Sequence, residues 1–171
     1  MTPIVGGQIR VFSFKEGLLS KVAHDLQFSL GRFEVESDGQ HVVARMLPSS
    51  LEVEGVMRKG QLDAHGVSDA DKQEIEGNLR QKVLQTDAHP RAVFSGDAVP
   101  APGGYRISGS LTLAGRTRDL AFEVRQEAGH WRAEIELVPS LWGIKPFKAW
   151  MGAIKLQDRV VVRIELPVVA L

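Results

Sequence analysis

Hydrophobic and polar residues alternate along much of the second half of the chain. The period is two over residues 105–113, 120–125, 131–137 and 160–166, where Arg, Ser, Thr or Glu separates the apolar positions. Successive side chains of a strand point to opposite faces, so this pattern predicts half-buried antiparallel β-strands. Turn-forming residues fill the breaks at 100–104, 114–118, 127–129 and 157–158, and they predict short hairpin connections.

The first half of the chain carries further strand candidates, at 9–14, 24–30, 33–35, 42–46, 51–53 and 91–96. The apolar parity changes after Gly31, and a glycine at such a change predicts a β-bulge. Eight or nine strands in one domain predict a sandwich or a barrel. The barrel is favoured because consecutive hairpins can close without leaving edges, and about eight strands leave room for one small ligand.

One segment follows a helical period instead. Residues 69–84 place Ile75, Leu79 and Val83 at positions i, i+4 and i+8, with a polar opposite face and Ser68 as a plausible N-cap. The predicted fold class is therefore all-β with one helix: an antiparallel β-barrel of about eight strands with the helix packed on it. We expect residues 1–171 to form one such domain.

Net charge and composition exclude several classes of protein. The chain has 21 Lys and Arg against 21 Asp and Glu, and this zero net charge argues against nucleic acid as a partner. The absence of cysteine removes disulfides, thiolate metal sites and a cysteine nucleophile. No run of 18 apolar residues occurs, so stable membrane insertion is not expected. The start of the sequence lacks the pattern of a signal peptide, which predicts a cytoplasmic protein.

Signatures of catalysis and metal binding are absent: the sequence has no HExxH, GxSxG, P-loop or GxGxxG motif, and no two histidines are close together. His24 stands apart because it lies on the apolar parity of its strand. It is either a polar group at a cavity mouth or a core histidine satisfied by a backbone carbonyl. Asp25 follows it directly, but neighbouring strand residues point to opposite faces, which places the two badly for proton transfer. We therefore expect no catalytic or metal-binding residues.

Two further features bear on whether the barrel interior is hollow or filled, and both possibilities stay open. The segment from Trp142 to Trp150 carries aromatic residues and lysines, so it is either an amphipathic flap at the barrel mouth or a plug packed inside it. Small residues such as Gly109 and Ala133 at sheet positions favour a hole, whereas Leu111, Phe122 and Trp131 favour a filled core.

The ordered motifs resemble those of the YceI-like family. SGSLTLAGRTRDLAFEV (108–124) is similar to its strand–turn–strand signature, and LRQKVLQTDAHPRAVFSG (79–96) to its helix followed by a Pro-led strand. DRVVVRIEL (158–166) resembles its closing strand, and RVFSFKEGLLSKVAHDL (10–26) its opening, in the variant that carries AHDL. One departure is Lys15-Glu16, which stands where the family commonly has a Lys-His pair.

The resemblance implies an extended lipocalin-like barrel whose apolar cavity binds or carries a polyisoprenoid, a fatty-acid derivative or a similar amphiphile. No other cofactor is expected, and a homodimer is among the expected partners because members of the family often dimerise. The alternatives are a non-catalytic interaction or stress-related module with a filled barrel, and a hydrolase-like enzyme using His24. The expected ligand contacts are Phe12, Phe14, His24, Leu26, Phe28, Phe94, Leu111, Phe122, Trp131, Ile135, Trp142 and Trp150.

Overall fold

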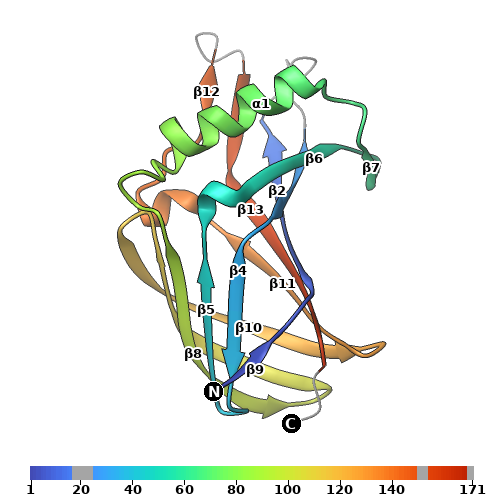
Figure 1. Ribbon diagram of the computed structural model, residues 1–171, viewed down its shortest axis with the longest axis vertical. Helices are drawn as coiled ribbons and strands as arrows, with labels where there is room; N and C mark the ends of the chain where they lie inside the picture. Colours follow the sequence, from blue (N-terminus) through green and yellow to red (C-terminus); the bar gives the residue numbers. More distant parts are fainter. Residues whose placement is uncertain (17–24, 150–153, 169–171) are drawn as a thin grey trace.

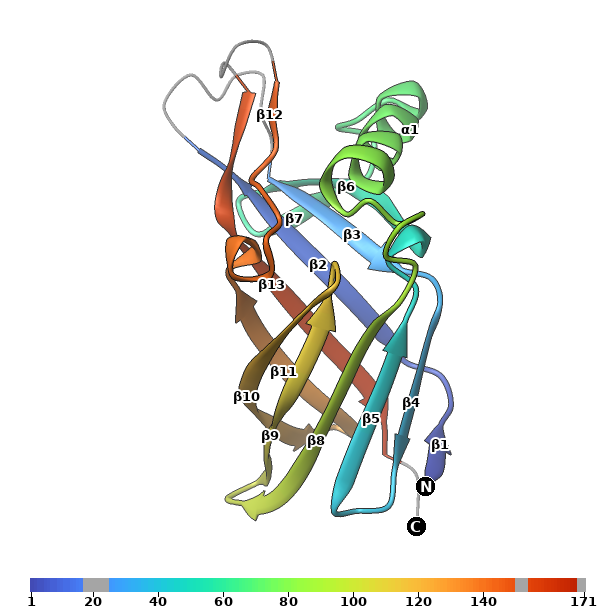
Figure 2. The same cartoon turned by 90° about the vertical axis from the view of Figure 1, so that its left-hand side faces the viewer.

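A strongly curved antiparallel sheet forms the body of the protein, and one helix crosses its upper end (Figures 1 and 2). The computed structural model describes residues 1–16, 25–149 and 154–168. Within these ranges the strands are β1 (Thr2–Ile4), β2 (Gln8–Lys15), β3 (Leu26–Leu30), β4 (Phe33–Ser37), β5 (His41–Met46), β6 (Leu51–Arg58), β7 (Gln61–Asp63), β8 (Ala92–Ala101), β9 (Gly104–Leu113), β10 (Arg116–Glu127), β11 (His130–Leu137), β12 (Lys148–Ala149) and β13 (Ile154–Pro167).

The strands follow one another in the order β1-β4-β5-β8-β9-β10-β11-β13-β2-β3-β6-β7, and β12 pairs with β13. The all-β fold with one helix is confirmed, but the sheet curls around its core without closing. β1 and β7 remain as the two ends of the order, where the sequence predicted a barrel without edges. The reason is that β3 and β4, although consecutive, take different partners: β3 pairs with β2 and β6, and β4 pairs with β1 and β5.

Gly31 marks this change of partners, not the predicted bulge. Its backbone N–H donates to the oxygen of Ser50 at 3.0 Å, and the N–H of Arg32 donates to the Ser50 hydroxyl at 2.9 Å. A Cβ at Gly31 would lie 3.3 Å from the Ser50 oxygen, so the chain passes close to its neighbour here. The register shifts lie elsewhere, between Gln27 and Phe28 in β3 and between Leu156 and Val160 in β13.

Three of the four predicted turns join consecutive strands of the β8–β11 meander. Two of them place an Ala-Gly pair at positive φ, at Ala114–Gly115 and Ala128–Gly129, which suits a two-residue hairpin whose twist matches that of its strands. The turn predicted at 157–158 is wrong. Both residues lie inside β13, where the register shift bends the strand while it continues to Pro167.

The helix begins where the sequence predicts. The Ser68 hydroxyl accepts a hydrogen bond from the Asp71 N–H at 3.1 Å, which caps α1 (Asp69–Asn78). A turn of π-helix (Leu79–Val83) continues it. Ile75 and Leu79 pack on a cluster of buried apolar side chains from the upper sheet and the segment before the helix: Leu26, Phe28, Val53, Val56 and Val67. The helix therefore packs across the upper part of the sheet and not the lower part (Figure 2).

Short 3-10 turns complete the described chain, at Pro48–Ser50 and Pro139–Trp142. The second follows β11 and brings Trp142 and Ile144 into a larger cluster of buried side chains on β8, β9 and β11. No helix within the described residues is long and apolar enough to cross a membrane.

Candidate functional site: an apolar cavity inside the curved sheet

The concave side of the sheet encloses a cavity of about 240 Å³. That volume exceeds the ~150 Å³ at which an apolar cavity stays dry and takes up benzene, and lies just below the ~300 Å³ of the smallest typical ligand pockets. The residues that line it come from nine strands and the β4–β5 turn: Thr2, Ile4, Ile9, Val35, Ser37, Gly39, Val42, Ala44, Met46, Phe94, Ala98, Tyr105, Ile107, Leu111, Leu120, Phe122, Val124, Trp131, Ala133, Ile135, Leu137, Val162, Ile164 and Leu166.

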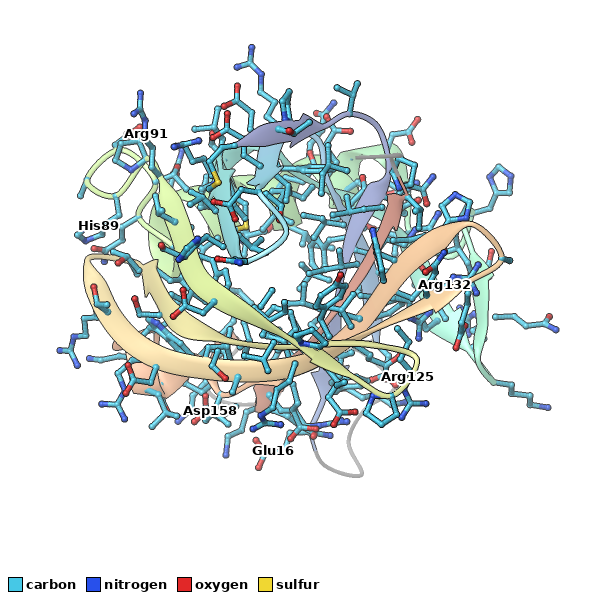
Figure 3. The ribbon with its side chains drawn as sticks, turned by 90° about the horizontal axis from the view of Figure 1, so that it is seen from below. Glu16, His89, Arg91, Arg125, Arg132 and Asp158 are labelled. Carbon is cyan, nitrogen blue, oxygen red and sulfur yellow. The ribbon has the colours of Figure 1, made fainter. Side chains whose placement is uncertain are left out.

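The alternation in the sequence is what points these side chains inward. On β9, Ile107 and Leu111 are buried, whereas Arg106 and Ser108 between and beside them are exposed. The same alternation repeats on β10, β11 and β13. The charged residues of these strands consequently point away from the cavity, and Figure 3 shows Arg125 and Arg132 on the outer side of the wall. Among the described residues that line the cavity, none has a charged side chain.

Two aromatic pairs form part of the wall. The rings of Phe94 and Phe122 lie 5.5 Å apart at 52°, and those of Tyr105 and Trp131 lie 5.5 Å apart at 67°. Both arrangements avoid a face-to-face stack, as the ring quadrupoles favour, and each pair contributes roughly 0.5–1.5 kcal/mol beyond its burial. The pairs connect β8 with β10 and β9 with β11, so they brace the curved wall.

The two ends of the cavity differ. At the lower end, near the N-terminus in Figure 1, residues with hydroxyl groups join the apolar wall: Thr2 and Ser37 are partners in the β1–β4 ladder, and Tyr105 is the second residue of β9. At the upper end Trp142 is 3% exposed and Ile144 is 6% exposed. The Trp142 indole N–H donates to the Leu111 oxygen at 2.9 Å. Trp142 therefore acts as the plug that its sequence segment allowed.

Gly109, the small residue that favoured a hole in the sequence, does not create the space. Gly96 and Gly109 are direct partners in the β8–β9 ladder. A Cβ on Gly109 would lie 2.1 Å from the Ser95 oxygen and 2.4 Å from the Gly96 Cα. These glycines allow two strands to approach closely where the sheet bends, whereas Ala133 lines the cavity itself.

The structure brings five of the expected ligand contacts together in the cavity wall: Phe94, Leu111, Phe122, Trp131 and Ile135. Leu26 and Phe28 lie in the separate cluster beneath α1, and Trp142 lies in the plug. His24 and Trp150 lie outside the described residues, so their expected contacts stay predictions.

Phe12 and Phe14 lie on the outer face of β2 and not in the cavity. The guanidinium of Arg163 lies 4.7 Å from the centre of the Phe12 ring, and that of Arg159 lies 4.4 Å from the Phe14 ring. The inward positions of β2 begin at Ile9, one residue out of phase with the two phenylalanines. The sequence interpretation followed the largest side chains and missed that arginines shield them from solvent.

Sequence reasoning also missed the wall contributed by β1, β4 and β5. Val42, Ala44 and Met46 alternate in the sequence, so their shared face carried a readable signal. Thr2 and Ile4 gave none, because a three-residue strand is too short to show a period. Within the described residues, no group of three or more His, Cys, Asp or Glu is placed to hold a metal ion.

Comparisons with known proteins agree with this geometry. The family model described as the YceI-like domain matches residues 10–168. No curated protein sequence matches the chain. Three similar solved structures have the same fold. Their sequence identities to this chain are 14% or lower, so the likeness shows the fold alone.

BcnA of Burkholderia cenocepacia has a TM-score of 0.66 at 14% identity, covering 95% of this chain and 96% of that one. A polyisoprenoid binding domain from Saccharophagus degradans, implicated in plant cell wall breakdown, has a TM-score of 0.58 at 12% identity, covering 95% and 93%. The YCEI protein of Campylobacter jejuni has a TM-score of 0.56 at 12% identity, covering 81% of each chain.

Proposed function

The chain belongs to the YceI-like domain family, and from that premise we propose that it binds a long-chain apolar ligand inside its curved sheet. The observation that carries the proposal is the cavity: about 240 Å³ of space whose described wall has no charged side chain. The similar domain from Saccharophagus degradans, which is described as polyisoprenoid binding, supports a polyisoprenoid or a fatty-acid derivative as the ligand class.

The energetics favour a long chain over a small ring. Burying each methylene group contributes about 0.8 kcal/mol. Association costs on the order of 4–15 kcal/mol in lost freedom of motion. Since the cavity offers few polar partners, the ligand has to bury many methylene or isoprene carbons before binding becomes favourable.

The two ends of the cavity suggest how the ligand lies. The upper end, under Trp142, is apolar and suits the end of the hydrocarbon chain. The hydroxyls of Thr2 and Tyr105 at the lower end suit a head group that accepts or donates hydrogen bonds, whereas the Ser37 hydroxyl is already bonded to His41 and Gly39 within its own turn. With no charged side chain in the described wall, an uncharged head group such as an alcohol is a better fit than a carboxylate.

Native mass spectrometry of the purified protein, followed by organic extraction, tests the proposal. We expect a discrete mass excess that disappears on extraction and matches an isoprenoid or fatty-acid derivative. Protein stripped of lipid should then bind an added polyprenol more tightly than a carboxylate of the same chain length. A protein that carries no lipid and takes up neither compound would contradict the proposal, and would favour the filled-barrel interaction module.

We propose binding without catalysis. The hydrolase-like alternative depends on His24, and His24→Ala tests what this residue contributes to ligand binding. We expect this variant to weaken ligand binding modestly, whereas complete loss would make His24 an anchor of the ligand. Homodimer formation, expected from the family resemblance, is measured separately by analytical ultracentrifugation of lipid-free and loaded protein.

A further inference from the structure

The wall of the cavity is split between β10 and β11. Their ladder contains three pairs, Arg125 with Arg132, Gln126 with Trp131 and Glu127 with His130. Both strands continue beyond these pairs, β10 back to Arg116 and β11 on to Leu137. By the same register residues 120–124 would face residues 133–137, yet within the described chain these stretches do not pair.

Each side of the split is firmly held by its other neighbour. β10 makes ten pairs with β9, and β11 makes eight pairs with β13. The ion pairs follow the same division. Glu134 and Glu136 of β11 pair with Arg163 and Arg159 of β13, at 3.4 and 2.9 Å. On β10, Arg125 and Glu123 pair within the strand, at 3.8 Å.

Residues beside the split border both sides of the wall. Five residues of β10, β11 and β13 line the apolar cavity and also line a groove on the outer surface: Leu120, Phe122, Ala133, Ile135 and Ile164. The outer groove is rimmed by charges of both signs, Arg125 and Arg132 among them, which Figure 3 shows on the outside of the sheet. Apolar cavity and polar surface therefore meet at this split.

The split has defined limits. At its lower end the β10–β11 hairpin closes it, where Arg132 pairs with Glu127 at 3.5 Å. At its upper end Arg116, the first residue of β10, lies against Gly143, so close that a Cβ there would be 2.9 Å from the guanidinium carbon. Between these closures the two strands are free to separate without breaking ladder hydrogen bonds.

We propose that the split between β10 and β11 is a lateral portal through which an apolar chain enters and leaves the cavity. This inference rests on the proposed function, because it concerns the route of the same ligand. Sideways entry suits a long flexible chain, which can slip between strands along its length. Entry through the lower end alone would require it to thread end-on past Thr2, Ser37 and Tyr105.

A reversible cross-link tests the portal, since the chain has no cysteine of its own. Glu123→Cys with Glu134→Cys places thiols at the first outward positions beyond the last pair. The matched control is Thr112→Cys with Thr117→Cys, because these partners in the β9–β10 ladder already have hydroxyls 2.7 Å apart. The probe is 11-(dansylamino)undecan-1-ol, a long chain with an uncharged head group, whose binding and release are followed by stopped-flow fluorescence. If oxidation fails to form the first disulfide, bismaleimidoethane joins the same thiols.

We expect the cross-link over the split to slow both association and dissociation by at least about tenfold, with the equilibrium affinity little changed. Reduction of the disulfide should return the association and dissociation rates to those of the unlinked protein. The control cross-link should leave both rates unchanged. If the cross-link over the split leaves the association and dissociation rates unchanged while Ser37→Trp slows them, the portal is overturned and the probe enters through the lower end of the cavity. Failure of the unmodified protein to bind the probe would overturn the proposed function itself, so the two failures are distinguishable.

Discussion

The indole N–H of Trp142 donates a hydrogen bond to the backbone oxygen of Leu111, which lies 31 positions earlier in the sequence. Leu111 lies in the cavity wall on β9, and Trp142 comes from the short turn after β11. The bond holds a large buried ring across the upper end of the cavity. The curved sheet supplies the walls, and a loop supplies the lid of its upper end.

Trp142→Phe tests that closure. The variant loses the hydrogen bond and part of the buried ring, so we expect the free energy of unfolding to fall by about 1–3 kcal/mol. Urea denaturation measures the change. Unfolding is monitored by far-UV circular dichroism, whose signal does not depend on the substituted tryptophan. The control is Leu141→Ala, since Leu141 is 46% exposed and its loss should cost within about 0.5 kcal/mol. Equal stability of both variants would contradict the role of Trp142 as a plug.

Phe122→Arg should abolish uptake of the apolar ligand. The guanidinium would stand in a cavity without a described counter-charge, and it would displace the ring that packs against Phe94. Native mass spectrometry of the variant measures the lipid it retains. Ser108→Arg is the control, because Ser108 is exposed on the outer face of β9 and should leave lipid content unchanged. Undiminished lipid in Phe122→Arg would show that the ligand lies elsewhere.

Phe12→Leu and Phe94→Leu separate packing from ligand contact. Both residues are buried, at 6% and 5% exposure, but Phe12 packs under Arg163 outside the wall and Phe94 faces the cavity. We expect both variants to lose about 1–2 kcal/mol of stability. Affinity for a fluorescent long-chain alcohol should fall several-fold only in Phe94→Leu. A matching loss in Phe12→Leu would place β2's phenylalanines in contact with the ligand after all.

Asp38, in the β4–β5 turn beside the cavity mouth, makes the stability of the folded protein depend on pH in the acid range. Hydrogen bonds from the backbone N–H groups of Gln40 and His41 lower the pKa of this carboxyl from 3.8 to about 2. A pKa lowered by folding stabilises the folded protein above the unfolded value, and that contribution is lost as the pH falls from 3.8 towards 2.

Asp38→Asn should therefore lower stability at neutral pH, where the ionised carboxylate contributes, and make the fall in stability over that acid range shallower, so that the two proteins converge towards pH 2. Thermal unfolding of both proteins at a series of acidic pH values measures this. An NMR titration of the Asp38 side chain provides the direct check. A midpoint near its usual value of 3.8 would contradict the prediction.

Much of the cavity wall was predictable, because the alternation of apolar and polar residues along a strand can be read from the local sequence. Ile107, Leu111, Phe122 and Ile135 face the cavity as their sequence pattern indicates, and Ser68 caps the helix where a cap was expected. A period of two determines which side chains share a face of a strand, whatever the rest of the fold does. It does not determine which face is inner when both carry large apolar residues.

That choice was made by tertiary structure. Phe12 lies outside because β13 places Arg163 over its ring, and the sequence of β2 contains no sign of that neighbour. Likewise, the split between β10 and β11 depends on strands that pair on one side and diverge on the other. Local sequence determined the strands, the helix and most of the cavity's side chains. Strand pairing, set by contacts between residues far apart in the chain, decided where the sheet stays open.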